Sequence, residues 1–146
     1  MSTAVPFATT AHVRDACLCL HTQRAARALG RRFDDALRPL GLTSGQFSLL
    51  MALNRPEPAA MSSVARLLAM DRTTLTAALK VLERHGLATV TVDPKDRRGR
   101  LLALTEDGRA GLAVAVPVWR ATHAAVEATL GGLDADALRT ALRALG

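Results

Sequence analysis

The sequence predicts a mainly helical domain that carries one small β-hairpin, an α+β arrangement. Hydrophobic residues make up 49% of the chain, aromatic residues only 3%, and isoleucine is absent, a composition that favours helices over a large sheet. Apolar residues recur at helical spacing on both sides of a short stretch that alternates with period two. A chain of 146 residues can bury the core of one domain without disulfides or metals. No stretch approaches about 20 uninterrupted apolar residues, so no membrane helix is expected.

The first predicted element is one long helix from about Val13 to Arg38, which Pro39 and Gly41 end. Its apolar stripe consists of Leu18, Ala25, Leu29, Phe33, Ala36 and Leu40. The N-terminal half is apolar on a second face as well, which indicates either deep burial or packing against another chain.

Two shorter helices are expected next. Thr43 and Gln46 have the spacing of a capping box, so a second helix should begin there and end in the loop at residues 55–58. Ser62 or Ser63 is then expected to cap a short third helix.

The fourth helix has signals at both ends, with Asp71 as the N-terminal cap and Gly86 as a left-handed C-terminal cap. Residues 88–92 then alternate as a half-buried strand should, and residues 101–104 return as a second strand. The polar residues 93–100 between them have turn chemistry, which predicts a β-hairpin with a long, charged tip.

A fifth helix is expected to begin at Thr105 and to contain a bend or a missing hydrogen bond at Pro117. Gly131 and Gly132 should end it, and Asp134 should cap a last helix. The predicted order is therefore four helices, a hairpin and two helices.

Positive charge is concentrated in the middle of the chain. The net charge is +6 overall, and residues 62–100 alone hold +4, which points to a polyanionic partner. The short helices at residues 62–69 and 71–85 have the size and spacing of a helix-turn-helix, and a hairpin directly after them is a wing. The polar face of the second of these helices carries Arg72, Thr73, Thr76, Lys80 and Arg84, side chains that can meet base edges in a major groove.

The predicted hairpin tip strengthens this interpretation. Its basic residues are Lys95, Arg97, Arg98 and Arg100, four within six positions, which suits phosphates and a narrow minor groove. Asp96 lies among them and is expected to hold an arginine in an extended pose. Each feature alone could be an ordinary solvated surface, but both in tandem favour nucleic-acid binding.

The stretch from Ser62 to Gly108 resembles the MarR family, bacterial transcription regulators with a winged helix-turn-helix. The wing signature Asp-x-Arg falls on Asp96 and Arg98, and the Leu-Thr-x-x-Gly that follows a wing occupies residues 104–108. Further matches are Gly41-Leu42-Thr43 and Gln46-Phe47, at the entry to the second helix.

The resemblance implies a single domain over residues 1–146, with a winged helix-turn-helix lobe at about 40–108 and dimerisation helices at 12–38 and 109–146. It implies a homodimer that acts as a repressor on a pseudo-palindromic operator in double-stranded DNA. A small aromatic or amphipathic effector would release the operator.

Carried over residue by residue, the resemblance predicts the DNA-contacting side chains. From the recognition helix these are Arg72, Thr73, Thr74, Thr76 and Lys80, to which the polar face adds Arg84. Ser62 and Ser63 would touch a phosphate at a helix N-terminus. Arg98, with Arg97 as a second probe, would enter the minor groove, and Asp96 would orient the arginine.

Two cysteines allow an alternative mode of regulation. The first ten residues lack the features of a signal peptide, which predicts a cytoplasmic protein in which a structural disulfide is not expected. On one continuous helix Cys17 and Cys19 would point about 200° apart, too far to bond to each other. They are either packed side chains or redox sensors, because Cys19 falls where the organic-hydroperoxide-sensing branch of the family keeps its reactive cysteine. That branch holds the thiolate with tyrosines, and here Gln23 and Phe33 stand in their places.

No catalytic, cofactor or metal motif is recognisable. Cys17 and His21 have the spacing of two metal ligands across a dimer, but two are few. No base or glycine-rich loop supports Cys19 as a nucleophile, so an enzyme such as a thiol peroxidase is the least favoured interpretation. The prediction is a regulator that is not an enzyme and needs no cofactor, with a cysteine-based redox-sensing regulator as the alternative.

Overall fold

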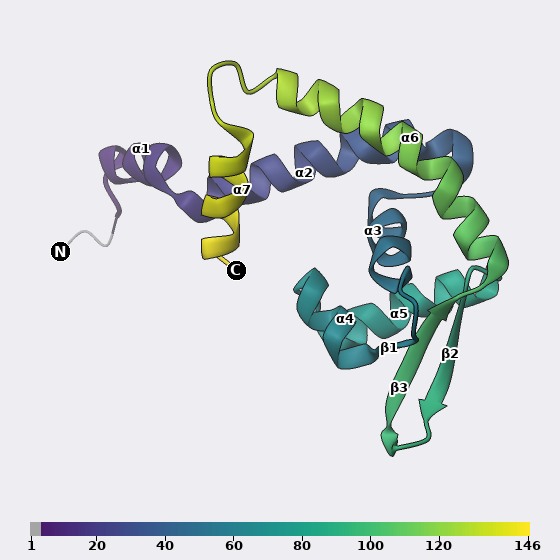
Figure 1. Ribbon diagram of the computed structural model, residues 1–146. Coiled ribbons are helices and arrows are strands. Elements are labelled where there is room, and N and C mark those ends of the chain that lie inside the picture. Colours follow the sequence, from purple (N-terminus) through teal and green to yellow (C-terminus); the bar gives the residue numbers. More distant parts are fainter. Residues whose placement is uncertain (1–3) are drawn as a thin grey trace.

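The computed structural model describes residues 4–146 (Figure 1). Its helices are α1 (Phe7–Ala16), α2 (Leu18–Leu37), the 3-10 turn η1 (Arg38–Leu40), α3 (Ser44–Leu53), α4 (Met61–Leu68), α5 (Arg72–Arg84), α6 (Glu106–Ala128) and α7 (Ala135–Ala144). The strands β1 (Ala59–Ala60), β2 (Ala88–Asp93) and β3 (Asp96–Leu104) form an antiparallel sheet in the order β1-β3-β2. The predicted α+β class is confirmed. Within residues 4–146, no helix has the length and apolarity needed to cross a membrane.

The molecule has two regions (Figure 1). The long helices α2 and α6 pack against each other, and α1 and α7 lie at the end of the molecule away from the sheet. Helix α3 packs against both long helices and also against α4 and β3, so it joins the two regions. The hairpin of β2 and β3 projects from the body beside α5.

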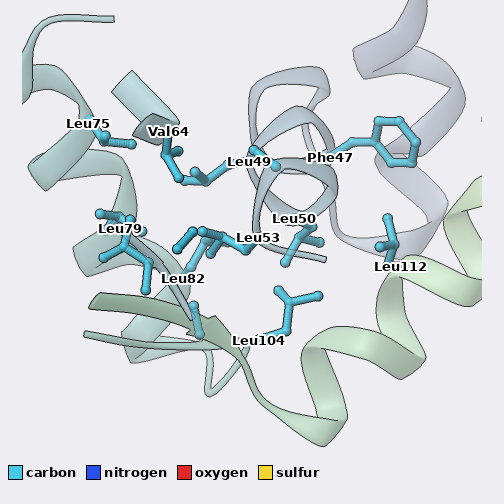
Figure 2. Packing of buried hydrophobic residues seen from close by; sticks show 14 of the residues in the cluster. Phe47, Leu49, Leu50, Leu53, Val64, Leu75, Leu79, Leu82, Leu104 and Leu112 are labelled. Atoms are coloured by element: carbon cyan, nitrogen blue, oxygen red, sulfur yellow. The ribbon is translucent and has the colours of Figure 1, made fainter. Parts of the chain in front are cut away.

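The hydrophobic core lies where α3, α4, α5, the sheet and the first half of α6 meet (Figure 2). Its largest fully buried side chains are Leu37, Leu50, Val64, Leu75, Leu79, Leu82 and Leu102. By contrast, α1 and α7 contain no buried residue. Two large apolar side chains in this region are mostly exposed: Phe7 by 78% and Leu133, just before α7, by 71%. The core therefore fixes the hairpin and its neighbouring helices. Apolar side chains stay exposed at the end of the molecule formed by α1 and α7.

The prediction of one helix from Val13 to Arg38 is wrong. The chain forms α1 and α2 with a break at Cys17, whose backbone is extended (φ −72°, ψ 108°). The Cys17 N–H donates to the Val13 carbonyl (3.0 Å), and the Cys17 thiol accepts from the Leu20 N–H (3.4 Å). Cys17 thus ends one helix and caps the next. A cysteine is not among the usual capping residues, so the pattern gave no sign of the break.

Most of the predicted caps are confirmed. Thr43 and Gln46 form the reciprocal capping box, with distances of 3.1 and 3.0 Å. The Asp71 carboxylate accepts from the Thr74 N–H (2.8 Å), and the Thr105 hydroxyl caps α6. Gly86 has the left-handed φ of 70° expected at the end of α5.

The expectation that Ser62 or Ser63 caps α4 is wrong. The helix begins one residue earlier, at Met61, and Ala60 occupies the cap position without a side-chain hydrogen bond. Ala59 and Ala60 pair with Leu102 and Leu101 of β3, so a two-residue strand fixes the entry to α4. Two alanines after a proline-rich loop carry no strand signal of their own, and this pairing depends on β3.

Candidate nucleic-acid interface

The exposed face of α5 presents a row of hydrogen-bonding side chains. Leu75, Leu79 and Leu82 hold its other face in the core, so the rotation of the helix is fixed. The outward residues Arg72, Thr73, Thr76, Ala77 and Lys80 line a shallow groove. Arg84 lies exposed at the last position of the helix, one turn beyond Lys80.

Two of the predicted threonines also bond within the helix. The Thr74 hydroxyl donates to the Asp71 carboxylate (2.7 Å), and the Thr76 hydroxyl donates to the Arg72 carbonyl (2.7 Å). Two hydrogen bonds lower the pKa of Asp71: the one from the Thr74 N–H has the larger effect, and the one from the Thr74 hydroxyl the smaller. An ionised carboxylate therefore caps the N-terminus of α5, where the helix dipole favours negative charge.

Arg55 lies beside the start of α4, a position that was not predicted from the sequence. Ser62 is exposed there and Ser63 half-buried, and the Ser63 hydroxyl donates to the Ala60 carbonyl (2.9 Å). The Arg55 guanidinium donates to the Ser63 hydroxyl (3.4 Å) and to the Ala52 carbonyl (3.0 Å). Arg55 belongs to the loop before β1, eight residues before Ser63, and the pairing of that segment with β3 places it beside these serines.

The wing is tighter than predicted. Only Pro94 and Lys95 form the turn, because Asp93 pairs with Asp96 and β3 begins there, so the prediction of a long tip over residues 93–100 is wrong. The next pair is Val92 with Arg100, which leaves Arg97, Arg98 and Gly99 in a bulge without partners on β2.

Side-chain carboxylates hold the turn and the bulge. Asp93 accepts from the Lys95 N–H (2.9 Å) and Asp96 from the Arg98 N–H (3.0 Å). In residues 4–146 neither aspartate forms an ion pair with an arginine. Asp96 therefore acts here on the backbone of Arg98. Because these carboxylates bind backbone N–H groups, the turn is short, although the polar composition of residues 93–100 predicted a long loop.

The bulge is also tied to α5. The Arg72 guanidinium donates to the Arg98 carbonyl (3.2 Å), and Arg100 donates to the carbonyls of Arg97 and Gly99 (3.2 and 3.0 Å). Within the described part of the chain, the guanidinium groups of Arg97 and Arg98 form no hydrogen bond or ion pair. The candidate interface thus combines the fixed helix α5 with a wing that carries the two exposed guanidinium groups of Arg97 and Arg98.

The sequence and the fold of this chain are similar to those of known proteins. The model of the MarR family matches residues 40–99. The solved structure of the transcriptional regulator MosR of M. tuberculosis in complex with DNA is 43% identical, with a TM-score of 0.80 over 88% of this chain and 92% of that one. The chain belongs to the MarR family of winged helix-turn-helix transcription regulators.

Two further relatives bear on function. BpsR of Bordetella bronchiseptica, whose DNA binding is regulated by 6-hydroxynicotinic acid, is 30% identical over 89% of this chain and 90% of that one (TM-score 0.71). The organic hydroperoxide resistance transcriptional regulator of Bacillus subtilis is 32% identical over 62% of each chain. The match covers between 51% and 62% of the length of the first curated relatives.

This MarR-family chain also has a cavity of about 530 Å³ between α3, α4 and α6. It is lined by Phe47, Ser48, Met51, Ala52, Leu67, Leu68, Val116, Trp119 and Arg120. A second cavity, of about 270 Å³, lies between α2, α3 and α6 and shares Phe47, Ser48 and Trp119 with the first. Trp119 stacks on Phe47 (centroids 6.2 Å apart) and on His123 (4.8 Å). Helical periodicity marks Trp119 as inward-facing, but it does not show that two cavities meet there.

The cysteines lie at the α1–α2 junction of the MarR-family chain and are free thiols. Cys17 is half-buried, whereas Cys19 is exposed and accepts a hydrogen bond from the Gln23 amide (3.3 Å). The predicted 200° separation does not apply, because Cys17 is not helical. His21 contacts the Asp15 carbonyl (3.1 Å). Across residues 4–146, no group of three or more His, Cys, Asp or Glu side chains is placed to hold a metal ion.

Proposed function

We propose that the chain is a sequence-specific repressor that binds a pseudo-palindromic DNA operator as a homodimer and is released by a small effector. The observation that carries this proposal is the interface itself. A helix fixed by its buried leucines and a wing with two unpaired guanidinium groups lie on the same lobe, tied together at Arg72. The similarity to MosR in its DNA complex supports it.

Each predicted residue has a role in this proposal. The α5 side chains that enter the major groove are Thr73, Thr74, Thr76, Lys80 and Arg84, and Arg72 lies at the N-terminal end of the same face. Ser62 and Ser63 bind a phosphate at the start of α4, and we add Arg55, whose guanidinium lies beside Ser63. Arg97 and Arg98 enter the minor groove, while Asp96 holds the backbone from which Arg98 projects.

Exposed apolar surface supports the homodimer. Along α1, the start of α2 and α7, the large apolar side chains Phe7, Val13, Leu18, Leu138, Leu142 and Leu145 are exposed. Apolar surface that gathers at one end of a molecule marks an interaction site. Residues 12–38 and 109–146 would form this dimerisation region, and residues 40–108 the DNA-binding lobe. A pair of recognition helices would then meet successive major grooves about 34 Å apart.

The larger cavity supports a small aromatic or amphipathic acid as the effector. Its lining is mainly apolar and includes Trp119, and Arg120 is the cationic residue among the residues that line it. The cavity lies between the DNA-binding helices α3 and α4 and the long helix α6. An occupant that binds one arrangement of lobe and long helices more tightly shifts the population toward it. The regulation of BpsR by 6-hydroxynicotinic acid supports this class of ligand.

Selection of DNA from a random pool, followed by a salt titration, tests the proposal. The selected sequence should bind more tightly than a scrambled one, with log K falling linearly against log salt. Arg98→Ala should weaken binding to it by at least ~1 kcal/mol at fixed salt. Equal affinity for the selected and scrambled sequences would contradict the proposal.

A redox-sensing regulator is the second candidate, and the position of Cys19 favours it. The exposed thiol lines a groove with Leu145, next to α7, so its oxidation would alter the proposed dimerisation region. The similarity to the organic hydroperoxide regulator of Bacillus subtilis supports it. Peroxide should then lower the operator affinity of the wild type but not of Cys19→Ser. Catalytic turnover of the peroxide would instead support a thiol peroxidase.

A further inference from the structure

We propose that Arg72 is a positioning residue that fixes the wing relative to the recognition helix, so that the two DNA-reading elements act as one unit. The proposal rests on the proposed DNA-binding function and adds to it a dependence of the wing on α5. It also assigns Arg72 a role other than base contact.

Arg98 projects from a bulge in β3. In a regular hairpin, the ladder of hydrogen bonds to the neighbouring strand fixes each backbone position. Arg97, Arg98 and Gly99 have no partners on β2. The Asp96 carboxylate accepts from the Arg98 N–H, and the Arg72 guanidinium donates to the Arg98 carbonyl. Side chains therefore hold both backbone groups of Arg98.

The hydrogen bond to the Arg98 carbonyl comes from the N-terminal end of α5. Arg72 is the first residue of the helix, directly after its cap Asp71. Its carbonyl accepts from the Thr76 hydroxyl (2.7 Å), and the leucines of α5 fix the helix in the core. The guanidinium therefore reaches the wing from a rigid base. A charged donor also makes a stronger hydrogen bond than a neutral one.

The other side chains that restrain the bulge belong to the wing itself. Arg100 donates to the carbonyls of Arg97 and Gly99, but Arg100 belongs to the same strand and moves with it. Asp96 is likewise part of the wing. The hydrogen bond from Arg72 differs from these, because its donor belongs to α5 and not to the wing. Its removal should leave β2 and β3 paired but loosen both the bulge and its position relative to α5.

The free protein gives the first test, which does not depend on DNA. Amide hydrogen exchange at residues 97–99 should speed up at least about threefold in Arg72→Ala, while the amides of α5 beyond its first turn keep their protection. Thr73→Ala removes the neighbouring side chain of the same face and should leave exchange in the wing unchanged. Unchanged exchange at residues 97–99 in Arg72→Ala would overturn the proposal.

The operator gives the second test, through double-variant cycles. Arg72→Ala and Arg98→Ala should each weaken binding about tenfold, and the double variant should bind almost as well as either one, because both remove the same wing contact. Lys80→Ala lies further along α5, so its effect should multiply with that of Arg98→Ala. Multiplying effects of Arg72→Ala and Arg98→Ala would overturn the proposal.

Base preference separates positioning from direct readout. If Arg72 positions the wing, Arg72→Ala should relax the preference at the outer base pairs that Arg98→Ala also relaxes. If Arg72 reads a base itself, the preference should relax at the inner base pairs of each half-site, and the proposal would be wrong. Failure of the proposed function is distinct from both outcomes, because the wild type would then prefer no DNA sequence.

Discussion

The Thr105 hydroxyl connects the end of α5 to the start of α6. It donates to the Gly86 carbonyl at the end of α5 (2.6 Å) and accepts from the Gly108 N–H at the start of α6 (3.0 Å). Thr105→Ala leaves both groups without this partner, so we expect the free energy of unfolding to fall by about 1–2 kcal/mol. Urea denaturation measures this change.

A matched variant separates the hydroxyl from the methyl group of Thr105. Thr105→Ser keeps both hydrogen bonds and should lie close to the wild type, whereas Thr105→Val should resemble Thr105→Ala. Equal stability of Thr105→Val and the wild type would show that these bonds contribute little.

Acid should weaken the join between α2 and α3 through Asp34. The Ser44 N–H donates to the Asp34 carboxylate (2.6 Å), and this bond, followed by the one from the Ser44 hydroxyl, lowers the pKa of Asp34. Because the pKa is lower in the folded than in the unfolded chain, the stabilisation is complete above the ordinary aspartate value of about 3.9. It is lost as the pH falls through the lower, folded value.

Urea denaturation of the wild type and Asp34→Asn at several pH values tests this expectation. Asp34→Asn should be less stable near about pH 7, and the difference should shrink below about pH 4. The control is Asp35→Asn, which removes an exposed carboxylate paired with Arg38 and should change stability little. A difference that does not vary with pH would assign the effect of Asp34→Asn to geometry and not to charge.

At the scale of elements, the end of α5 must approach α6 closely, and Gly108 permits this. A Cβ atom at Gly108 would lie 2.0 Å from the Leu87 carbonyl oxygen, which is impossible without a backbone shift. Gly108→Ala should therefore lower the free energy of unfolding by about 2–4 kcal/mol, since overpacking against backbone has no easy relief.

Gly111 in the same helix provides the control. A Cβ atom there would meet nothing within 4 Å, so Gly111→Ala should be neutral or stabilising by up to about 1 kcal/mol. Thermal and urea unfolding of both variants would check the contrast, and equal effects would remove close packing as its cause.

The elements that sequence reasoning placed correctly have local signals. Thr43, Asp71, Gly86 and Thr105 act on neighbours within a few residues, so their positions in the sequence suffice to predict caps. The break at Cys17 has no such signal, and β1 exists only because β3 pairs with it. The bulge at residues 97–99 follows from the register of two strands, which composition does not reveal.

For the candidate site, the same reasoning finds residue types but not the contacts between distant segments. The polar face of α5 and the arginines of the wing follow from periodicity and charge. The bond from Arg72 to the Arg98 carbonyl and the place of Arg55 beside Ser63 depend on tertiary packing. Arg120 likewise becomes a cavity residue only when α3 and α4 pack against α6.

At the scale of the whole molecule, the cavity beside Trp119 would connect effector binding to the lobe. We expect a small aromatic carboxylic acid of the proposed effector class to lower the operator affinity of the wild type, and Arg120→Met to raise the concentration required about tenfold, because a charge-assisted contact is lost. Fluorescence anisotropy of a labelled operator measures both values.

The uncharged amide of the same acid is the matched ligand. It should act more weakly on the wild type, and Arg120→Met should not reduce its effect further. An equal response of the wild type and Arg120→Met to the acid would exclude Arg120 as the counter-ion.

Operator binding should also require the exposed apolar end of the molecule. Leu138, Leu142 and Leu145 follow helical spacing along and just beyond α7, and they are exposed by 39%, 47% and 59%. A charge buried at a dimer interface without a partner is strongly unfavourable, so Leu142→Asp should shift the protein from dimer to monomer. Light scattering should show this lower mass. The circular dichroism spectrum of Leu142→Asp should remain that of a folded helical protein.

The loss of dimerisation should appear in DNA binding as well. A monomer meets only one half-site, so the affinity of Leu142→Asp for the full operator should fall by about a hundredfold or more, while its affinity for an isolated half-site stays that of a wild-type protomer. Thr140→Asp adds the same charge about 200° around α7 and should remain dimeric. If Leu142→Asp were a dimer with full operator affinity, this face would not be the dimer interface, and the operator symmetry would have to arise from another surface.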